Sequence, residues 1–132
     1  MARNRVSSRM EKFSYQNSHT VAASGDFFTS WQLDAGEVEA QVKRIMCSMS
    51  STSGHQSTFQ LGLFQLQPAL ADFDLDEAIV ISGAIGNQCW HNETITMRVP
   101  KGWYIGVKVH NFQASGPSDV IVSLQLNYKV LN

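Results

Sequence analysis

The last strand-forming segment of the chain alternates between apolar and polar side chains over twelve residues. In residues 120–131, "VIVSLQLNYKVL", one face carries Val120, Val122, Leu124, Leu126, Tyr128 and Val130. The opposite face carries mainly polar residues, which are Ser123, Gln125, Asn127 and Lys129. A period of two is that of a β-strand with one face on a core and the other on solvent. The segment therefore predicts a long antiparallel strand that reaches almost to the end of the chain.

Seven further extended segments are predicted. They are residues 12–22, 27–33, 38–49, 58–66, 78–82, 94–99 and 103–110. In the third of them the apolar pattern changes phase after Val42, which predicts a β-bulge near Lys43 and Arg44. Phe64 and Leu66 occupy the face opposite to the apolar one in the fourth segment, so we expect that strand to be covered on both faces.

The rest of the chain contains little that favours a helix. Residues 68–78, "PALADFDLDEA", are the one helix-compatible stretch, and residues 83–92 are either a glycine-rich connector or an irregular strand. The length of 132 residues fits one domain with a sizeable core. About eight strands with almost no helix predict an all-β sandwich or barrel. We assign residues 1–12 to a basic N-terminal arm and residues 13–132 to a single β-domain.

The C-terminal third resembles a known architecture. An alternating strand, the turn and strand "VPKGWYIGVKV", a loop and the long final strand lie within residues 93–132. This succession is similar to the last three strands of single jelly-roll domains, above all those of viral capsid proteins; trimeric ligands of the tumour-necrosis-factor type share the architecture. The resemblance implies a single jelly-roll antiparallel β-sandwich. It also implies a structural capsid protein that self-assembles into an icosahedral shell of the virion, with other virion proteins as further partners, after synthesis in the host cytoplasm.

The low charge content favours a protein that contacts other proteins. It also predicts only limited contact with nucleic acid. Only 16% of the residues are charged, against about a quarter in typical domains, and the net charge is -1. A neutral polar surface is cheaper to bury than a charged one, although an ordinary β-domain can carry it too. The arm holds four cations, Arg3, Arg5, Arg9 and Lys12, which can face the interior of a shell or run beneath neighbouring subunits. Four cations neutralise few phosphates, so either the inner face of the shell carries more charge or something else condenses the genome.

An acidic stretch offers a weak candidate for a metal site. Asp72, Asp74 and Asp76 stand at alternate positions, as at the start of a calcium-binding loop. Glu77 occupies the position of the required glycine, and Gly83 that of the required bidentate glutamate. We therefore expect a solvated acidic loop, and we predict no cofactor and no metal.

Three tryptophans are the candidates for an interface. Trp31, Trp90 and Trp103 can fill the ends of a sandwich, contact another subunit, or stack on sugars or bases. We favour subunit contacts, with a glycan- or receptor-binding module of the spike or lectin kind as the alternative function. Cys89 and His91 lack a second ligand pair or an orienting group, so neither a zinc site nor an enzyme is predicted. No apolar run reaches the length of a transmembrane helix, and no secretory signal is visible.

Overall fold

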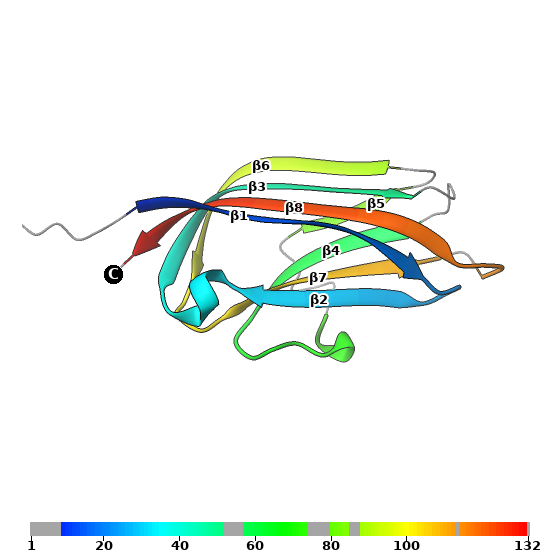
Figure 1. The fold of residues 1–132 in the computed structure, drawn as a ribbon, viewed down its shortest axis with the longest axis horizontal. Helices are drawn as coiled ribbons and strands as arrows, with labels where there is room; N and C mark the ends of the chain where they lie inside the picture. Colours follow the sequence, from blue (N-terminus) through cyan, green and yellow to red (C-terminus); the bar gives the residue numbers. More distant parts are fainter. Residues whose placement is uncertain (1–8, 52–56, 74–79, 85–87, 113, 132) are drawn as a thin grey trace, which may run out of the picture.

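A computed structural model of the chain describes residues 9–51, 57–73, 80–84, 88–112 and 114–131. For residues 51, 80–84 and 88–93 it describes the backbone and not the side chains. The described residues form eight β-strands and two short 3₁₀ helices (Figure 1). The strands are β1 (Arg9–Val21), β2 (Asp26–Gln32), β3 (Glu39–Ser51), β4 (Ser57–Phe64), β5 (Val80–Ala84), β6 (Gln88–Val99), β7 (Tyr104–Asn111) and β8 (Ser118–Leu131). The helices are η1 (Leu33–Gly36) and η2 (Leu70–Asp72).

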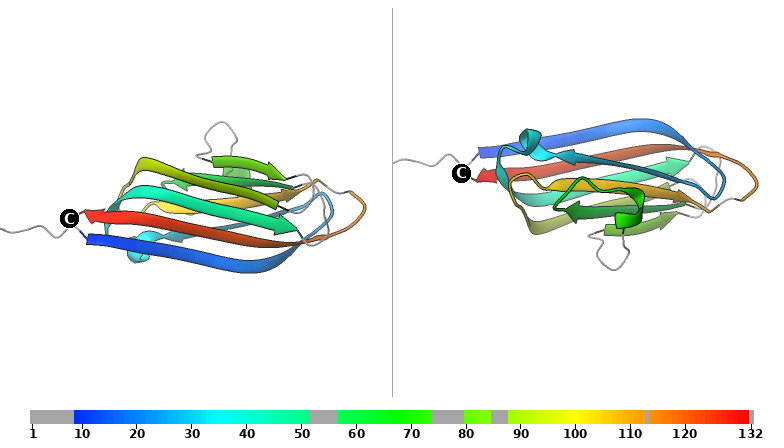
Figure 2. Two further views of the ribbon diagram at one scale, coloured as in Figure 1. Left: turned by 90° about the horizontal axis from the view of Figure 1, so that it is seen from above. Right: turned by 90° about the horizontal axis from the view of Figure 1, so that it is seen from below.

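The strands form two four-stranded antiparallel sheets that face each other. The first sheet has the order β1-β8-β3-β6 and the second the order β2-β7-β4-β5. Figure 2 shows the first sheet from its outer side in the left view and the second in the right view. The first strand pairs with the last, the second with the seventh, the third with the sixth and the fourth with the fifth. This nested pairing is a jelly-roll, so the predicted fold class is confirmed.

The long final strand occupies the centre of the first sheet. It pairs with β1 on one side and with β3 on the other. Its predicted apolar face lies in the core, where Val120, Val122, Leu124, Leu126 and Val130 are fully buried and Tyr128 is 3% exposed. Burying an aliphatic side chain of this size stabilises the fold by about 1.5–3 kcal/mol. The alternation in the sequence thus sets which face of the sheet meets the core.

The predicted β-bulge in β3 is confirmed. The register of β3 against both β6 and β8 shifts between Val42 and Arg44. The extra residue lets Val42 and Ile45 both face the core, where each is fully buried. The bulge thus keeps the apolar residues of β3 on one face of the sheet, although the apolar alternation changes phase after Val42.

Most strand boundaries differ from the sequence expectation by one or two residues, and those of β1 and β6 differ by more. β1 begins at Arg9 rather than at residue 12, because Arg9 pairs with Val130 of β8. β6 begins at Gln88 and includes half of residues 83–92, the expected connector or irregular strand, because β3 is long enough to pair with it as far as Ser50. Within residues 68–78, the described part holds only the single turn η2.

A row of aromatic side chains closes one edge of the sandwich. The rings of Phe13 and Tyr15 on β1 lie 5.2 and 4.6 Å from that of Trp31 on β2. The ring of His19 stacks on that of Phe27 at 3.6 Å. Burial lowers the pKa of His19, which keeps the stacked ring neutral at physiological pH. These contacts seal the gap between the two sheets along β1 and β2.

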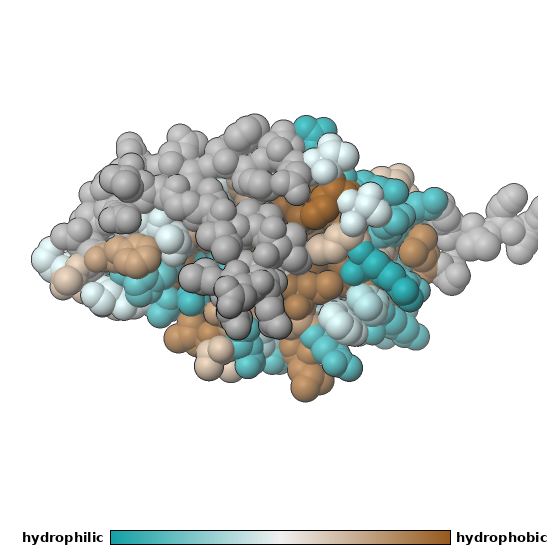
Figure 3. Space-filling view, turned by 180° about the vertical axis from the view of Figure 1, so that it is seen from behind, coloured by the Kyte–Doolittle hydropathy of each residue, from teal (hydrophilic) through white to brown (hydrophobic). Residues whose placement is uncertain are grey.

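The outer face of the second sheet carries a small apolar layer of its own. The ring of Phe73, beside η2, lies 4.8 Å from that of Phe64 and 5.9 Å from that of Phe28. Gly62 and Gly106 leave room for these rings against the sheet. This contact covers the outer face of β4 at Phe64, as predicted, whereas Leu66 lies beyond the end of the strand and is 78% exposed. Figure 3 shows hydrophobic residues at the surface along the lower rim, on the side of the β4–β5 connection.

We expect Gly106→Ala to destabilise the protein. A Cβ at this position would lie 2.9 Å from Phe64 Cε2 and 3.0 Å from Phe73 Cζ, so both rings would have to move. Overpacking of this kind costs about 1–3 kcal/mol. Gly116→Ala is the matched control, since a Cβ there meets no described atom within 4 Å. Urea unfolding of the two variants measures the difference, and equal stabilities would contradict the expectation.

Candidate functional site

The outer face of the first sheet carries cations on each of its four strands, and the strand pairing places four of them close together. These four are Lys12 of β1, Arg44 of β3, Arg98 of β6 and Lys129 of β8. Each stands next to a core-facing residue in its strand, and the alternation of the strand therefore directs it outward. We call these four residues the cationic band.

The strand register brings the four residues into two neighbouring rows. Lys12 and Arg44 lie in one row, on either side of Asn127. In the next row, Lys129 pairs with Gln41, which in turn pairs with Arg98. Neighbouring strands are about 4.8 Å apart and same-face residues along a strand about 7 Å apart. The cationic band therefore crosses the whole width of the sheet within a narrow strip.

Acidic residues compensate only part of this charge. Arg98 forms an ion pair with Glu39, whereas Lys12 and Lys129 form no ion pair with any described residue. Lysines in this arrangement attract anions through their summed field, and salt screens that attraction. The chemistry that the band can perform is the binding of a polyanion.

A buried acceptor lies inside the cationic band. Asn127 Oδ1 has no hydrogen-bond partner among the described residues, and it is inaccessible to solvent. Asn127 lines a shallow cleft of about 410 Å³ together with Met10, Glu11 and Lys12. If the Asn127 side chain turns toward this cleft, a partner that offers a hydroxyl or amide donor would satisfy the oxygen.

The four predicted arm cations divide between different roles. Arg3 and Arg5 lie outside the described residues. Lys12 belongs to the cationic band within β1. Arg9 is the first residue of β1 and is held in ion pairs with Glu11 and Asp34. The predicted arm thus overlaps β1 over residues 9–12.

The predicted tryptophans are not gathered at one surface. Trp31 is half-buried in the aromatic row that closes the sandwich edge, and Trp103 is half-buried against the core. The backbone N–H of Trp103 donates to the carbonyl of Pro100 across the predicted turn, where Gly102 has a φ of 85°. Trp90 pairs with Ser48 through β6, and its side chain lies outside the described ones. Trp31 and Trp103 therefore pack within their own subunit.

The acidic candidates have local roles where they are described. Asp72 Oδ2 accepts a hydrogen bond of 2.8 Å from the backbone N–H of Ala69, which holds the turn at η2. Asp74 and Asp76 lie outside the described residues. Among the described side chains no group of three or more potential metal ligands occurs. Cys47 is a buried core residue, 4% exposed.

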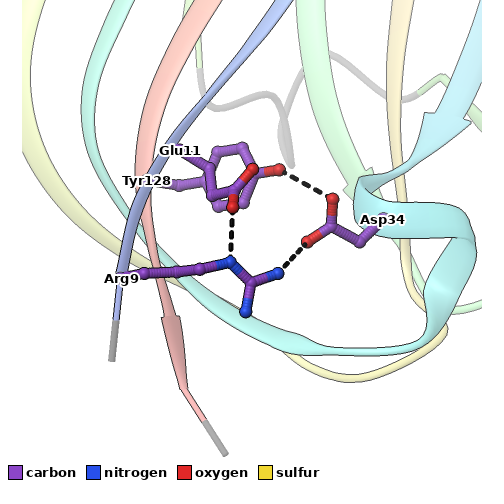
Figure 4. A network of polar contacts seen from close by, with 4 residues as sticks. All are labelled: Arg9, Glu11, Asp34 and Tyr128. Atoms are coloured by element: carbon purple, nitrogen blue, oxygen red, sulfur yellow. Dashed lines mark hydrogen bonds and ion pairs between the residues drawn. The ribbon is translucent and has the colours of Figure 1, made fainter. Parts of the chain in front are cut away.

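A polar network anchors the start of β1 beside the cationic band. Tyr128 Oη donates a hydrogen bond of 3.2 Å to Asp34 Oδ1, and Arg9 Nη2 lies 3.5 Å from Asp34 Oδ2 (Figure 4). Asp34 and Ala35 adopt φ values of 48° and 56°, a left-handed conformation that costs about 1–2 kcal/mol per residue. Burial, followed by the nearby Asp34 carboxylate, raises the pKa of Tyr128 to about 12. The network thus ties β1, β8 and η1 together at one end of the sandwich.

Sequence reasoning identified Lys12 and missed the other three members of the cationic band. Arg44, Arg98 and Lys129 all stand at polar positions of predicted strands, so their outward direction was visible in the alternation. Their proximity was not visible, since it depends on which strands pair and in which register.

Comparison with known proteins shows the fold alone. No protein-family model and no curated protein matches the chain. Among solved structures, it is similar to the Yersinia pseudotuberculosis-derived mitogen YPM, with a TM-score of 0.52 and 11% identity over 84% of each chain. It is also similar to the decameric BFDV capsid protein, with a TM-score of 0.43 and 9% identity over 96% of this chain and 100% of that one. The first likeness places the chain among all-β sandwich proteins, and the second TM-score is too low to add to it.

The described residues contain no helix that is long and apolar enough to cross a membrane.

We expect Tyr128→Phe to change how stability depends on pH. Below pH 10 the wild-type protein should be the more stable one by about 1 kcal/mol, because the variant lacks the hydrogen bond to Asp34. Above pH 10 an unfolded tyrosine loses its proton, while folded Tyr128 keeps its own up to about 12. The raised pKa thus stabilises the fold below pH 10, and this stabilisation is lost as pH rises towards 12. Urea unfolding across this range should show the wild-type advantage shrinking, and a constant advantage would contradict the expectation.

Proposed function

We propose that the chain is a structural viral capsid protein, many copies of which assemble into an icosahedral shell with the cationic band facing the packaged nucleic acid. The observation that carries the proposal is the band itself, one cation from each of the four strands of a single sheet. Cations arranged in this way can neutralise consecutive phosphates of a nucleic-acid backbone. Arg44, Arg98 and Lys129 add inner-face charge to the four cations of the predicted arm.

The remainder of the same sheet face suits contact with further copies. Away from the band, the outward residues of the first sheet are mostly polar and uncharged, with Ile121 as an apolar member. The polar ones include Ser14, Gln16, Ser18, Ser48, Ser50, Ser123 and Gln125. Such side chains lose little free energy on burial when they find hydrogen-bond partners, and interfaces are depleted in charge at their centres.

The edges of the first sheet also favour self-association. β1 has 13 residues and β6 has 12, and each pairs with one described strand only. The free backbone groups of a long edge strand offer a template for pairing with another chain. In a closed shell neighbouring copies cover such edges, since each subunit touches others on several sides.

Electron microscopy and sedimentation of the purified protein test the assembly. We expect closed particles far larger than a monomer or a trimer, and particle formation that depends on salt and pH. A protein that remains monomeric at high concentration under all these conditions would overturn the proposal. A stable trimer would also overturn it, in favour of a spike or ligand-like head.

Nucleic-acid binding tests the role of the cationic band. For a single-stranded oligonucleotide, the slope of log K against log salt should fall by about 0.7 for each phosphate contact removed. The double variant Lys12→Gln/Lys129→Gln should therefore lose about 1.4 from the slope measured by fluorescence anisotropy. Lys108→Gln, on the outer face of the second sheet, is the matched control and should leave the slope unchanged. A similar loss in the control, or none in the double variant, would exclude this role.

A further inference from the structure

A second cleft lies on the opposite side of the molecule from the cationic band. It has a volume of about 290 Å³ and opens on the outer face of the β2-β7-β4-β5 sheet. Its lining mixes polar, charged and aromatic side chains: Asp26, Thr58, Gln60, Lys108, His110 and Phe112. The proposed assembly and nucleic-acid contact use none of them.

Three neighbouring strands bring the polar residues of the cleft together. Asp26, His110 and Thr58 lie side by side in one row of β2, β7 and β4. Lys108 and Gln60 lie side by side in the next row. Rigid, paired strands therefore fix the spacing of five polar groups, as a preformed binding site requires.

The pairing of Asp26 and His110 decides which atoms remain available to a ligand. His110 Nδ1 lies 2.8 Å from Asp26 Oδ1, and in the tautomer that carries its proton on Nδ1 the ring donates to this carboxylate. His110 Nε2 is then an acceptor, and Asp26 Oδ2 is a second one. Lys108 offers donors and Thr58 a hydroxyl.

Gln60 supplies a third acceptor that no described residue satisfies. Its side chain lines the cleft, and the residue is only 3% exposed. Its Oε1 has no hydrogen-bond partner among the described residues. The oxygen lies beneath the surface of the cleft, so the Gln60 side chain has to turn outward before a ligand can donate to it. An unsatisfied buried acceptor costs about 1–3 kcal/mol, and this cost favours the turn when a donor is present.

Phe112 adds an apolar wall at the rim of the cleft. The residue is 50% exposed, and its ring stands edge-on to that of His110 at a centroid distance of 4.4 Å. A half-exposed aromatic ring beside fixed hydrogen-bonding groups can hold a ligand that has an apolar face and polar edges.

We propose that this cleft binds a neutral saccharide. The hydroxyls of a pyranose can donate to Asp26 Oδ2, to His110 Nε2 and to Gln60 Oε1, and Lys108 can donate to a sugar oxygen. The C–H face of the ring can pack on Phe112. Asp26 and Lys108 bring opposite charges to this cleft, so it lacks the excess of positive charge that draws a polyanion to the cationic band and suits a neutral ligand better.

A neutral-glycan array, followed by saturation-transfer NMR with the methyl glycoside of the best-bound sugar, tests the proposal on the full chain. We expect binding that weakens at least tenfold in Phe112→Ala. Leu66→Ala is the control, because Leu66 is 78% exposed and lies outside this cleft. It should change the affinity less than twofold. No bound glycan, or equal binding by Phe112→Ala and wild type, would overturn the proposal. Binding of a free nucleobase at Phe112, together with the absence of any glycan binding, would also overturn the proposal.

Gln60→Met separates a ligand-binding role from a structural one. Methionine has a similar shape and no buried acceptor, so the variant should be at least as stable as the wild type. It should nevertheless bind the glycan several-fold more weakly. A variant that binds equally well would show that Gln60 Oε1 does not meet the ligand and would contradict this part of the proposal. Particle formation is measured separately, so the failure of either proposal leaves the other standing.

Discussion

The position of β8 at the centre of the first sheet is the constraint on which the rest of the structure depends. β8 lies between β1 and β3 and pairs with both, and its buried face forms one side of the core. Because side chains alternate along a strand, burying Leu124 and Leu126 also fixes Gln125 and Lys129 on the outer face. One pattern thus determines the core, the register of the neighbouring strands and the place of the cationic band.

The two outer faces of the sandwich differ in chemistry, and on both faces the pairing of strands brings the polar residues together. On the first sheet, cross-strand neighbours collect cations and leave the remaining face nearly uncharged. On the second sheet, the pair Asp26 and His110 stands beside a cleft, and the glycines of β4 and β7 accept an extra aromatic layer. The two sheets can therefore bind two chemically different partners, one on each outer face, without a conformational change of the strands.

Much of the fold was predictable from the sequence, and much of the surface was not. The alternation in β8 and the change of phase after Val42 correctly predicted a strand and a bulge, since both follow from local periodicity. The tryptophans were harder to place, because the aromatic partners of Trp31 come from a different strand. The cationic band and the second cleft depend on register between strands far apart in sequence, which periodicity does not encode. The sequence therefore predicted the strands better than it predicted the surroundings of single residues.

The nested pairing also sets the order in which the protein can be completed during its synthesis. Even the closest partners of β1 and β8, Val21 and Ser118, are 97 positions apart in the chain. β1 and β3 therefore remain without the strand that joins them until β8 has left the ribosome. Closing such distant contacts is slow, and unpaired strands are prone to aggregate in the meantime. The nascent chain must therefore stay soluble until β8 has been made and the first sheet can be completed.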